Sequence, residues 1–163
     1  MIEVTVGHLG LDRTTNTPVV ILREKNGNRV LPIWIGPAEA SAIAMEMQGV
    51  KPPRPMTHDL LKTIITGLGA ELRRVVISAL KDKTYFAELM LQREDHHYQF
   101  DARPSDSIAL ALRLSAPIFT QDQLLEQTAI EAADTEQESS LDAEQLKRYL
   151  EKMDPQDFGR FMP

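Results

Sequence analysis

The segments RVLPIWIGPAEASAIAMEMQGV (residues 29–50) and HYQFDARPSDSIALALRLSAPI (residues 97–118) decide how this chain is organised. An offset of 67 residues aligns the matching positions of the two segments and places Pro37 on Pro104 and Glu39 on Asp106. Each copy passes from alternating apolar residues to a proline, then to an acidic residue, and then to an apolar run of helical character. Because position, order and residue type agree, we interpret the two segments as copies of one duplicated unit.

Apolar alternation predicts the strands around these segments. Three strands are expected in each copy, over residues 2–9, 18–24, 29–35, 71–80, 85–92 and 97–102. Between the second and third strands, Asn26-Gly27 is expected to supply the positive φ of a tight hairpin. Such hairpins predict a mostly antiparallel sheet.

Helices are expected over residues 37–48, 57–66, 105–115 and 121–127. Pro37 suits the first helical position because an N–H there has no helical partner anyway, and Gly49 ends that helix. Thr57 is expected to N-cap the second helix. The predicted fold class is therefore α+β, with a duplicated βββα-type unit whose mostly antiparallel sheet is covered by helices.

The charge divides the chain into a neutral body and an acidic tail. Residues 1–126 carry 14 Lys/Arg against 15 Asp/Glu, whereas residues 127–163 carry 4 against 9. We predict a domain over 1–128, an acidic linker over 129–140, and an amphipathic helix with a tail over 141–163. The tail is a candidate docking segment for a partner protein, and sheet edges in the body favour a homo-oligomer.

Composition excludes several classes of protein. The chain has 163 residues and no cysteine, which excludes disulfides, thiolate zinc sites and cysteine nucleophiles. No apolar stretch approaches the roughly 18 residues of a membrane span, and the start MIEVTV does not resemble a signal peptide. The expected location is the cytoplasm, or an organelle lumen if a presequence has been lost. A net charge of −6 without a basic run argues against a tight, non-specific DNA binder, but not against an enzyme with a small site.

Polar residues that can carry chemistry gather at the predicted strand-to-helix turns and around the Pro-rich loop. The candidate ligands for Mg²⁺ or Mn²⁺, which prefer oxygen donors, are Glu39, Asp59, Asp101 and Asp106. The candidate catalytic residues are His58, Asp59, Asp106 and Glu39. A bound metal ion can generate a hydroxide and stabilise a phosphodiester transition state, and a histidine can act as general acid or base. Arg54 and Arg103 are candidates for binding phosphate through their planar guanidinium groups.

A purely structural interpretation of these residues stays open. An acid in the first turn of a helix offsets the helix dipole by a few tenths to about 1 kcal/mol, which alone can explain Glu39 and Asp106. Arg103 can simply pair with a neighbouring aspartate. The sequence has no Gly-rich phosphate loop, nucleophile elbow or HExxH motif. Spacing alone therefore leaves the reaction class open.

Three blocks of the chain resemble the bifunctional nuclease family: LPIWIGPAEASAIAMEMQGV, PRPMTHDLL and FDARPSDSIALALR. The resemblance covers roughly residues 1–128, and the tail is similar to the extension of bacterial members. A departure is Met56, where leucine is common, and that exchange nearly conserves volume. The signature blocks include the residues Glu39, Arg54, His58, Asp59, Asp101, Arg103, Ser105 and Asp106.

The resemblance implies a compact α+β domain with a duplicated strand–helix unit. It also implies nuclease activity on DNA and RNA, which is attributed to plant members, but it assigns no catalytic residues. We therefore expect a nuclease that hydrolyses phosphodiester bonds of DNA, RNA or both, with a possible need for Mg²⁺ or Mn²⁺. The alternative is a non-catalytic module that binds a protein partner or a small anionic ligand.

Overall fold

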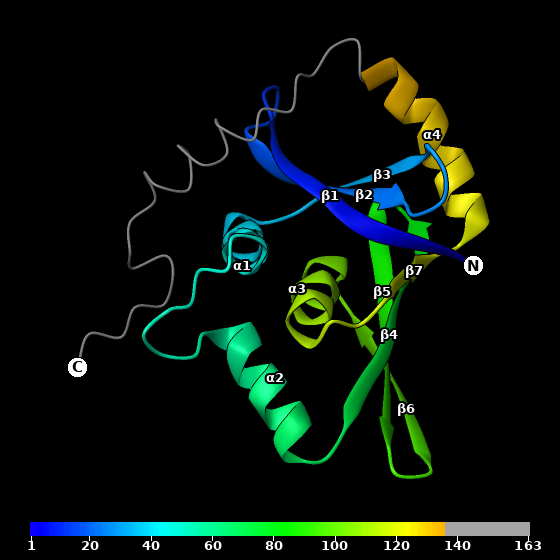
Figure 1. The fold of residues 1–163 in the computed structure, drawn as a ribbon. Coiled ribbons are helices and arrows are strands. Elements are labelled where there is room, and N and C mark those ends of the chain that lie inside the picture. Colours follow the sequence, from blue (N-terminus) through cyan, green and yellow to red (C-terminus); the bar gives the residue numbers. More distant parts are fainter. Residues whose placement is uncertain (136–163) are drawn as a thin grey trace.

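The computed structural model describes the backbone of residues 1–135 and the side chains of residues 1–128 (Figure 1). Seven strands and four helices follow one another along this part of the chain. Their bounds are β1 Ile2–Asp12, β2 Thr17–Glu24, β3 Val30–Trp34, α1 Pro37–Met47, α2 Thr57–Gly67, β4 Glu71–Lys81, β5 Thr84–Arg93, β6 His96–Ala102, α3 Pro104–Leu114, β7 Ile118–Thr120 and α4 Asp122–Thr135.

All seven strands form one sheet with the order β3-β2-β1-β7-β4-β5-β6. Each half of the sheet is a meander of three antiparallel strands. The short strand β7 lies between the halves, antiparallel to β1 and parallel to β4. The predicted α+β class with a mostly antiparallel sheet is therefore confirmed.

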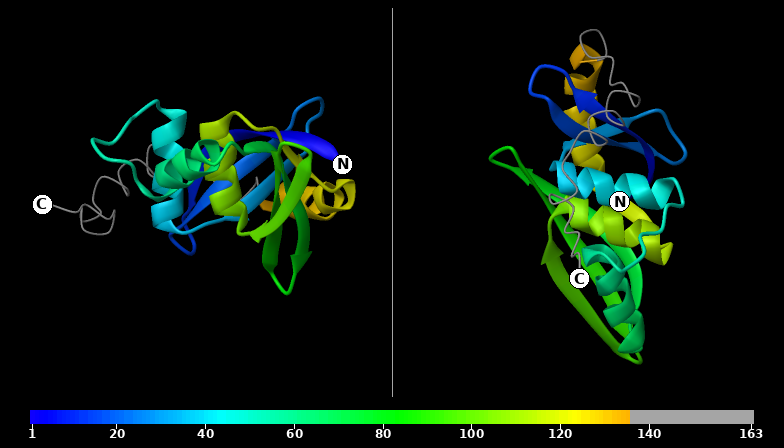
Figure 2. Two further views of the ribbon diagram at one scale, coloured as in Figure 1. Left: turned by 90° about the horizontal axis from the view of Figure 1, so that it is seen from below. Right: turned by 90° about the vertical axis from the view of Figure 1, so that its left-hand side faces the viewer.

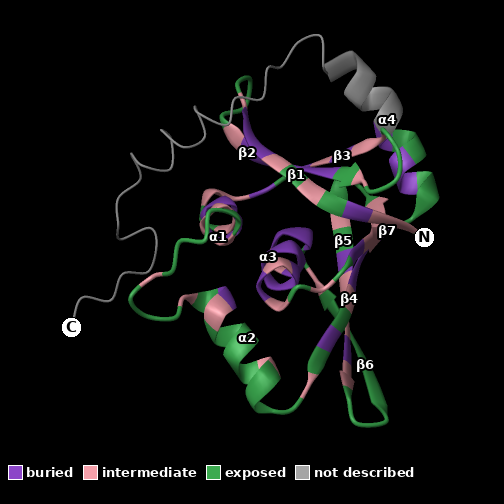
Figure 3. Cartoon of the chain, viewed as in Figure 1, coloured by how far each residue is buried: buried purple, intermediate pink, exposed green. Residues whose placement is uncertain are grey.

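The core lies between the sheet and the pair α1 and α3, which pack side by side (Figure 2). Ile43 of α1 and Ile108 of α3 have no exposed surface, and neither do Val20, Leu31 and Val75 of the sheet. Figure 3 shows α3 buried over most of its length, whereas the outer face of α2 and nearly all of β6 are exposed. Two helices thus bring both strand-to-helix turns to one place in the molecule.

Helix α1 begins at Pro37 and helix α3 begins at Pro104, each with proline in the first turn. Gly49 follows α1 with φ of +67°, the left-handed conformation expected of a glycine that ends a helix. The two helices keep the 67-residue offset of the sequence repeat, but the duplication itself stays a prediction.

The structure corrects four local predictions. Asn26 and Gly27 do not adopt positive φ; a longer connection spans residues 25–29 and is held by the Glu24–Arg29 ion pair. The N-cap of α2 is Met56 rather than Thr57, and the Asp59 carboxylate accepts the Met56 N–H at 3.0 Å.

The other two corrections concern the end of the body. Strand β7 was not predicted, because three residues give too short an alternation to recognise. Helix α4 runs to Thr135, so the first residues of the predicted linker are helical. The helix predicted over 141–152 and the tail to residue 163 lie outside the described residues. Within residues 1–135, no helix is long and apolar enough to cross a membrane.

Candidate functional site

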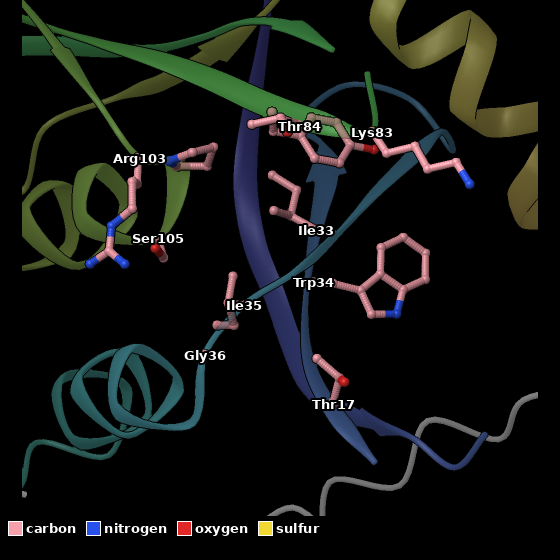
Figure 4. A pocket seen from close by; sticks show the side chains of 11 residues that line it. Thr17, Ile33, Trp34, Ile35, Gly36, Lys83, Thr84, Arg103 and Ser105 are labelled. Carbon is pink, nitrogen blue, oxygen red and sulfur yellow. The ribbon is translucent and has the colours of Figure 1, made fainter. Parts of the chain in front are cut away.

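A cleft of about 350 Å³ opens where the two strand-to-helix turns meet. The N-caps of the two helices, Gly36 for α1 and Arg103 for α3, both have extended backbone and no side-chain cap. Both residues line the cleft, together with the end of β3 and the turn between β4 and β5 (Figure 4). The first-turn N–H groups of a helix favour anions nearby, so this arrangement suits a negatively charged ligand.

The cleft combines one exposed aromatic ring with two cationic side chains. Trp34 is 46% exposed and is fixed by its indole N–H, which donates to Asp12 at 2.9 Å. This hydrogen bond holds the pKa of the Asp12 carboxyl below its usual range. Lys83 and Arg103 contribute the positive charge of the lining. A cleft lined by an aromatic ring and by cations offers a stacking surface for a base and positive charge for a phosphate.

Arg103 is the centre of an ion-pair cluster at the cleft. Its Nε and Nη2 atoms donate to the two carboxylate oxygens of Asp106 at 2.7 and 3.1 Å. Its Nη1 atom lies 2.8 Å from the Glu39 carboxylate. Gly36 leaves room for that carboxylate, because a Cβ at Gly36 would collide with it. The cluster joins the first turns of α1 and α3 while the Arg103 side chain stays 65% exposed.

His58 lies behind this cluster and completes it. Its Nε2 atom is 2.9 Å from Asp106 Oδ1, although the two residues are 48 positions apart. The His58 residue is buried, with only 8% exposure. Partial burial alone would raise the pKa of Asp106, but Arg103 and His58 outweigh it and hold that pKa below its usual range. Asp106 is therefore an ionised hydrogen-bond acceptor, and its partner on the buried side is the imidazole ring of His58.

Asp59 belongs to a second cluster rather than to the cleft. Its carboxylate accepts a hydrogen bond from Arg113 Nε at 2.7 Å. Arg113 is buried and also donates to the carbonyl oxygens of Ala109 and Ala42 at 3.0 and 3.1 Å. The Arg113 guanidinium therefore connects α1, α2 and α3. Asp59, at the start of α2, has a structural role in this connection.

The stability of the domain is expected to fall as the pH is lowered from about 5 toward 3. Burial tends to raise the pKa of Asp59, but Arg113 and the Met56 N–H hold it below the usual 3.8. A carboxyl whose pKa is lower in the folded state stabilises that state above its unfolded pKa, and this contribution is lost as the group is protonated. Urea unfolding between pH 7 and pH 3 measures the effect. The Asp59→Asn variant should show a shallower fall; an unchanged slope would contradict the assignment.

The remaining two predicted site residues lie apart from both clusters. Arg54 is exposed in the loop between α1 and α2. Asp101 is on β6, where it lies directly across from Glu88 of β5. The structure thus brings Glu39, His58, Arg103 and Asp106 together and leaves the others elsewhere.

The four predicted metal ligands do not form one ligand set. Glu39 and Asp106 are bound by Arg103, and Asp59 is bound by Arg113. Among the described residues, no group of three or more His, Asp or Glu side chains is placed to hold a metal ion. This geometry does not fit the predicted metal centre, and the need for Mg²⁺ or Mn²⁺ stays a prediction.

Sequence reasoning missed Trp34, Lys83 and Arg113 as site residues. Trp34 is the single tryptophan of the chain and follows an alternating strand, which was a usable signal. Lys83 sits in a two-residue turn with positive φ, and Arg113 binds a residue 54 positions away. No local pattern indicates either of these two.

Residues 1–135 thus form an α+β fold with a charged cleft at paired helix starts. The family model of the bifunctional nuclease domain matches residues 20–133. The chain therefore belongs to the bifunctional nuclease domain family.

Individual relatives fall into two groups. An uncharacterized protein of Mycobacterium tuberculosis is 43% identical over 162 residues, covering 96% of this chain and 97% of that protein. Bifunctional nuclease 2 of Oryza sativa is 31% identical over 105 residues, covering 62% of this chain and 32% of that protein. Bifunctional nuclease 1 of Arabidopsis thaliana is 30% identical over 115 residues, covering 69% and 35% respectively. The chain thus matches only about a third of each plant protein.

Proposed function

We propose that this chain is a nuclease that hydrolyses phosphodiester bonds of DNA, RNA or both at the cleft between the two helix starts. The observation that carries the proposal is the exposed Arg103 side chain, fixed between Glu39 and Asp106 at the cleft wall. Membership of the bifunctional nuclease domain family and the printed names of the plant relatives support the same reaction class.

The cleft residues suggest how a strand is held. The exposed ring of Trp34 offers a surface on which a base can stack. The Arg103 guanidinium has five N–H donors, so donors remain for a phosphate oxygen beyond the three that face Glu39 and Asp106. Lys83 adds a second cation at the rim. These groups would fix one nucleotide with its phosphate against Arg103.

The Asp106–His58 pair is the proton-handling part of the proposal. Asp106 is ionised and its side chain is 28% exposed, so its carboxylate can orient an attacking water. His58 is bonded to Asp106 through Nε2, which fixes its ring and keeps Asp106 in place. Because His58 is buried, we assign it a positioning role rather than direct contact with the strand.

The test is a cleavage assay with highly purified protein and labelled single-stranded RNA and DNA, in Mg²⁺, Mn²⁺ or EDTA. A Glu39→Ala/Asp106→Ala double variant, purified identically, is the matched preparation. We expect wild-type cleavage and a loss of about 100-fold or more in the variant. Equal cleavage by both preparations would remove the cleft from the mechanism. Cleavage that survives EDTA would remove the metal ion from it.

A second candidate function is a non-catalytic module that binds a small anionic ligand or a protein. It is favoured by one observation: every carboxylate of the cleft cluster is already paired with Arg103, and His58 is buried. Absence of cleavage by the wild type under every condition of the same assay would support this candidate. The tail over 141–163 is the segment proposed for a protein partner.

A further inference from the structure

Strand β6 is an open edge of the sheet. It is the last strand in the order, and every residue from His96 to Asp101 is exposed. The opposite edge strand, β3, is contacted by helix α4 and alternates between buried and less buried residues. An exposed edge presents unpaired N–H and C=O groups and is a template for a further strand. A helix therefore contacts the β3 edge of the sheet, whereas the β6 edge is exposed.

Two aromatic rings of β6 extend the core face of the sheet into solvent. In the β5–β6 register, Tyr98 lies opposite Leu91 and Phe100 lies opposite Leu89. Opposite residues of an antiparallel pair share a face, and Leu91 and Leu89 belong to or pack against the core. Yet Tyr98 is 42% and Phe100 is 49% exposed. Their rings stack with 6.3 Å between centroids, so they form a partly exposed aromatic surface on this edge strand.

The outer face of β6 carries an unbalanced charge at one end. Asp101 lies directly opposite Glu88 of β5, and like charges in that position repel. Within residues 1–128, neither carboxylate forms an ion pair with a lysine or arginine. His97 lies on the same face of β6, four residues before Asp101. The strand is thus acidic at one end and has a basic residue type at the other.

We propose that β6 pairs antiparallel with β6 of a second copy of this chain, about a two-fold axis at Gln99. This register places His97 opposite Asp101 of the partner subunit, twice by symmetry. It also places Tyr98 opposite Phe100 of the partner subunit, so that four rings form one apolar cluster on the core face. The two seven-stranded sheets become one continuous sheet, and both unpaired edges disappear.

The register follows from charge and faces. Moving the axis to Tyr98 would place Asp95 opposite the partner's Asp101, with two like-charged pairs in each dimer. Moving it to Phe100 would leave Tyr98 opposite the partner's Ala102 and lose the four-ring cluster. Only the axis at Gln99 satisfies both the aromatic residues and the charges.

Disulfide trapping in the full-length chain tests both the surface and the register. The chain has no cysteine, so a single introduced cysteine can form a protein disulfide only with the same position of a second copy. In Gln99→Cys, the two Cα atoms across the axis lie about 4.5–5.5 Å apart, within disulfide reach. In the matched control His97→Cys, on the same strand and face, the symmetric positions lie about 14 Å apart. Sedimentation of the wild type measures the dimer independently.

We expect a concentration-dependent dimer and at least ten-fold faster oxidative cross-linking of Gln99→Cys than of His97→Cys. Asp101→Lys should weaken the dimer several-fold, and the added change His97→Glu should restore it. A wild type that sediments as a monomer at all concentrations would overturn the proposal. So would a dimer in which the two cysteine variants cross-link equally, because another surface would then hold the subunits together.

Discussion

The Arg103→Ala variant should lose at least about 100-fold in kcat/KM for cleavage of single-stranded RNA or DNA. Arg103 is the cation that balances Glu39 and Asp106 at the cleft wall. Without it, two carboxylates face the phosphate that must enter, and the cleft changes from attracting an anion to repelling one. The free energy of unfolding should change by less than about 1 kcal/mol, because the Arg103 side chain is 65% exposed.

Two further variants make this result interpretable. Arg103→Lys keeps the charge but loses the planar group that spans both acids, so intermediate activity is expected. Arg73→Ala removes the same charge from an exposed ion pair with Glu71, outside the cleft. If Arg73→Ala lost as much activity as Arg103→Ala, the effect would be one of overall charge. If Arg103→Ala cleaved like the wild type, the proposed cleft would not be the site of cleavage.

The Arg113→Ala variant should unfold with a free energy about 3 kcal/mol lower than that of the wild type. The Arg113 side chain is only 5% exposed and donates to Asp59 and to the carbonyls of Ala42 and Ala109. Its removal leaves the partly buried Asp59 carboxylate without its guanidinium partner and takes one hydrogen bond from the Ala42 carbonyl of α1. Three helices also lose the group that connects them.

Urea unfolding at pH 7 measures this change, and Arg113→Lys is the matched control. Lysine keeps the charge but cannot donate in three directions from a planar group, so a smaller loss is expected. Adding Asp59→Asn to Arg113→Ala should recover part of the stability, because the unpaired charge disappears. A loss below 1 kcal/mol in Arg113→Ala would show that the three helices are held together by their apolar packing alone.

The parts of the fold that could be predicted from the sequence depend on local chemistry. Pro37 and Pro104 begin helices because proline lacks the N–H that a first turn leaves unpaired, and Gly49 ends one because it adopts positive φ. The alternation of apolar and polar residues predicts the six longer strands, because that pattern also depends only on neighbouring residues. The Asn26-Gly27 prediction was wrong because the turn is longer, and the Glu24–Arg29 pair closes it instead.

Only part of the candidate site could be singled out from the sequence, which missed Trp34 and Lys83 of the cleft. The sequence singled out Glu39, His58, Arg103 and Asp106, and the structure brings them together. It could not show that Asp59 turns away to Arg113, because that pairing depends on how three helices pack. Whether a carboxylate is free for a metal ion or is already held by an arginine is likewise decided by tertiary structure.

The three residues of β7 also determine when the sheet can be completed. β1 pairs with β7 through Ile2 and Thr120, which lie far apart in the sequence, and β7 is the last strand within residues 1–135. Each three-strand meander contains mainly local contacts and can form early. Joining them requires closure of a loop that spans almost the whole domain.

A long-range pairing of this kind forms more slowly than a local hairpin, because closing the intervening loop costs conformational entropy. During synthesis, the edges of β1 and β4 stay open until residues 118–120 have left the ribosome. A nascent chain of this protein therefore exposes the edge of β1, and after residue 81 that of β4 as well, until β7 emerges, and this interval gives chaperones an opportunity to bind it.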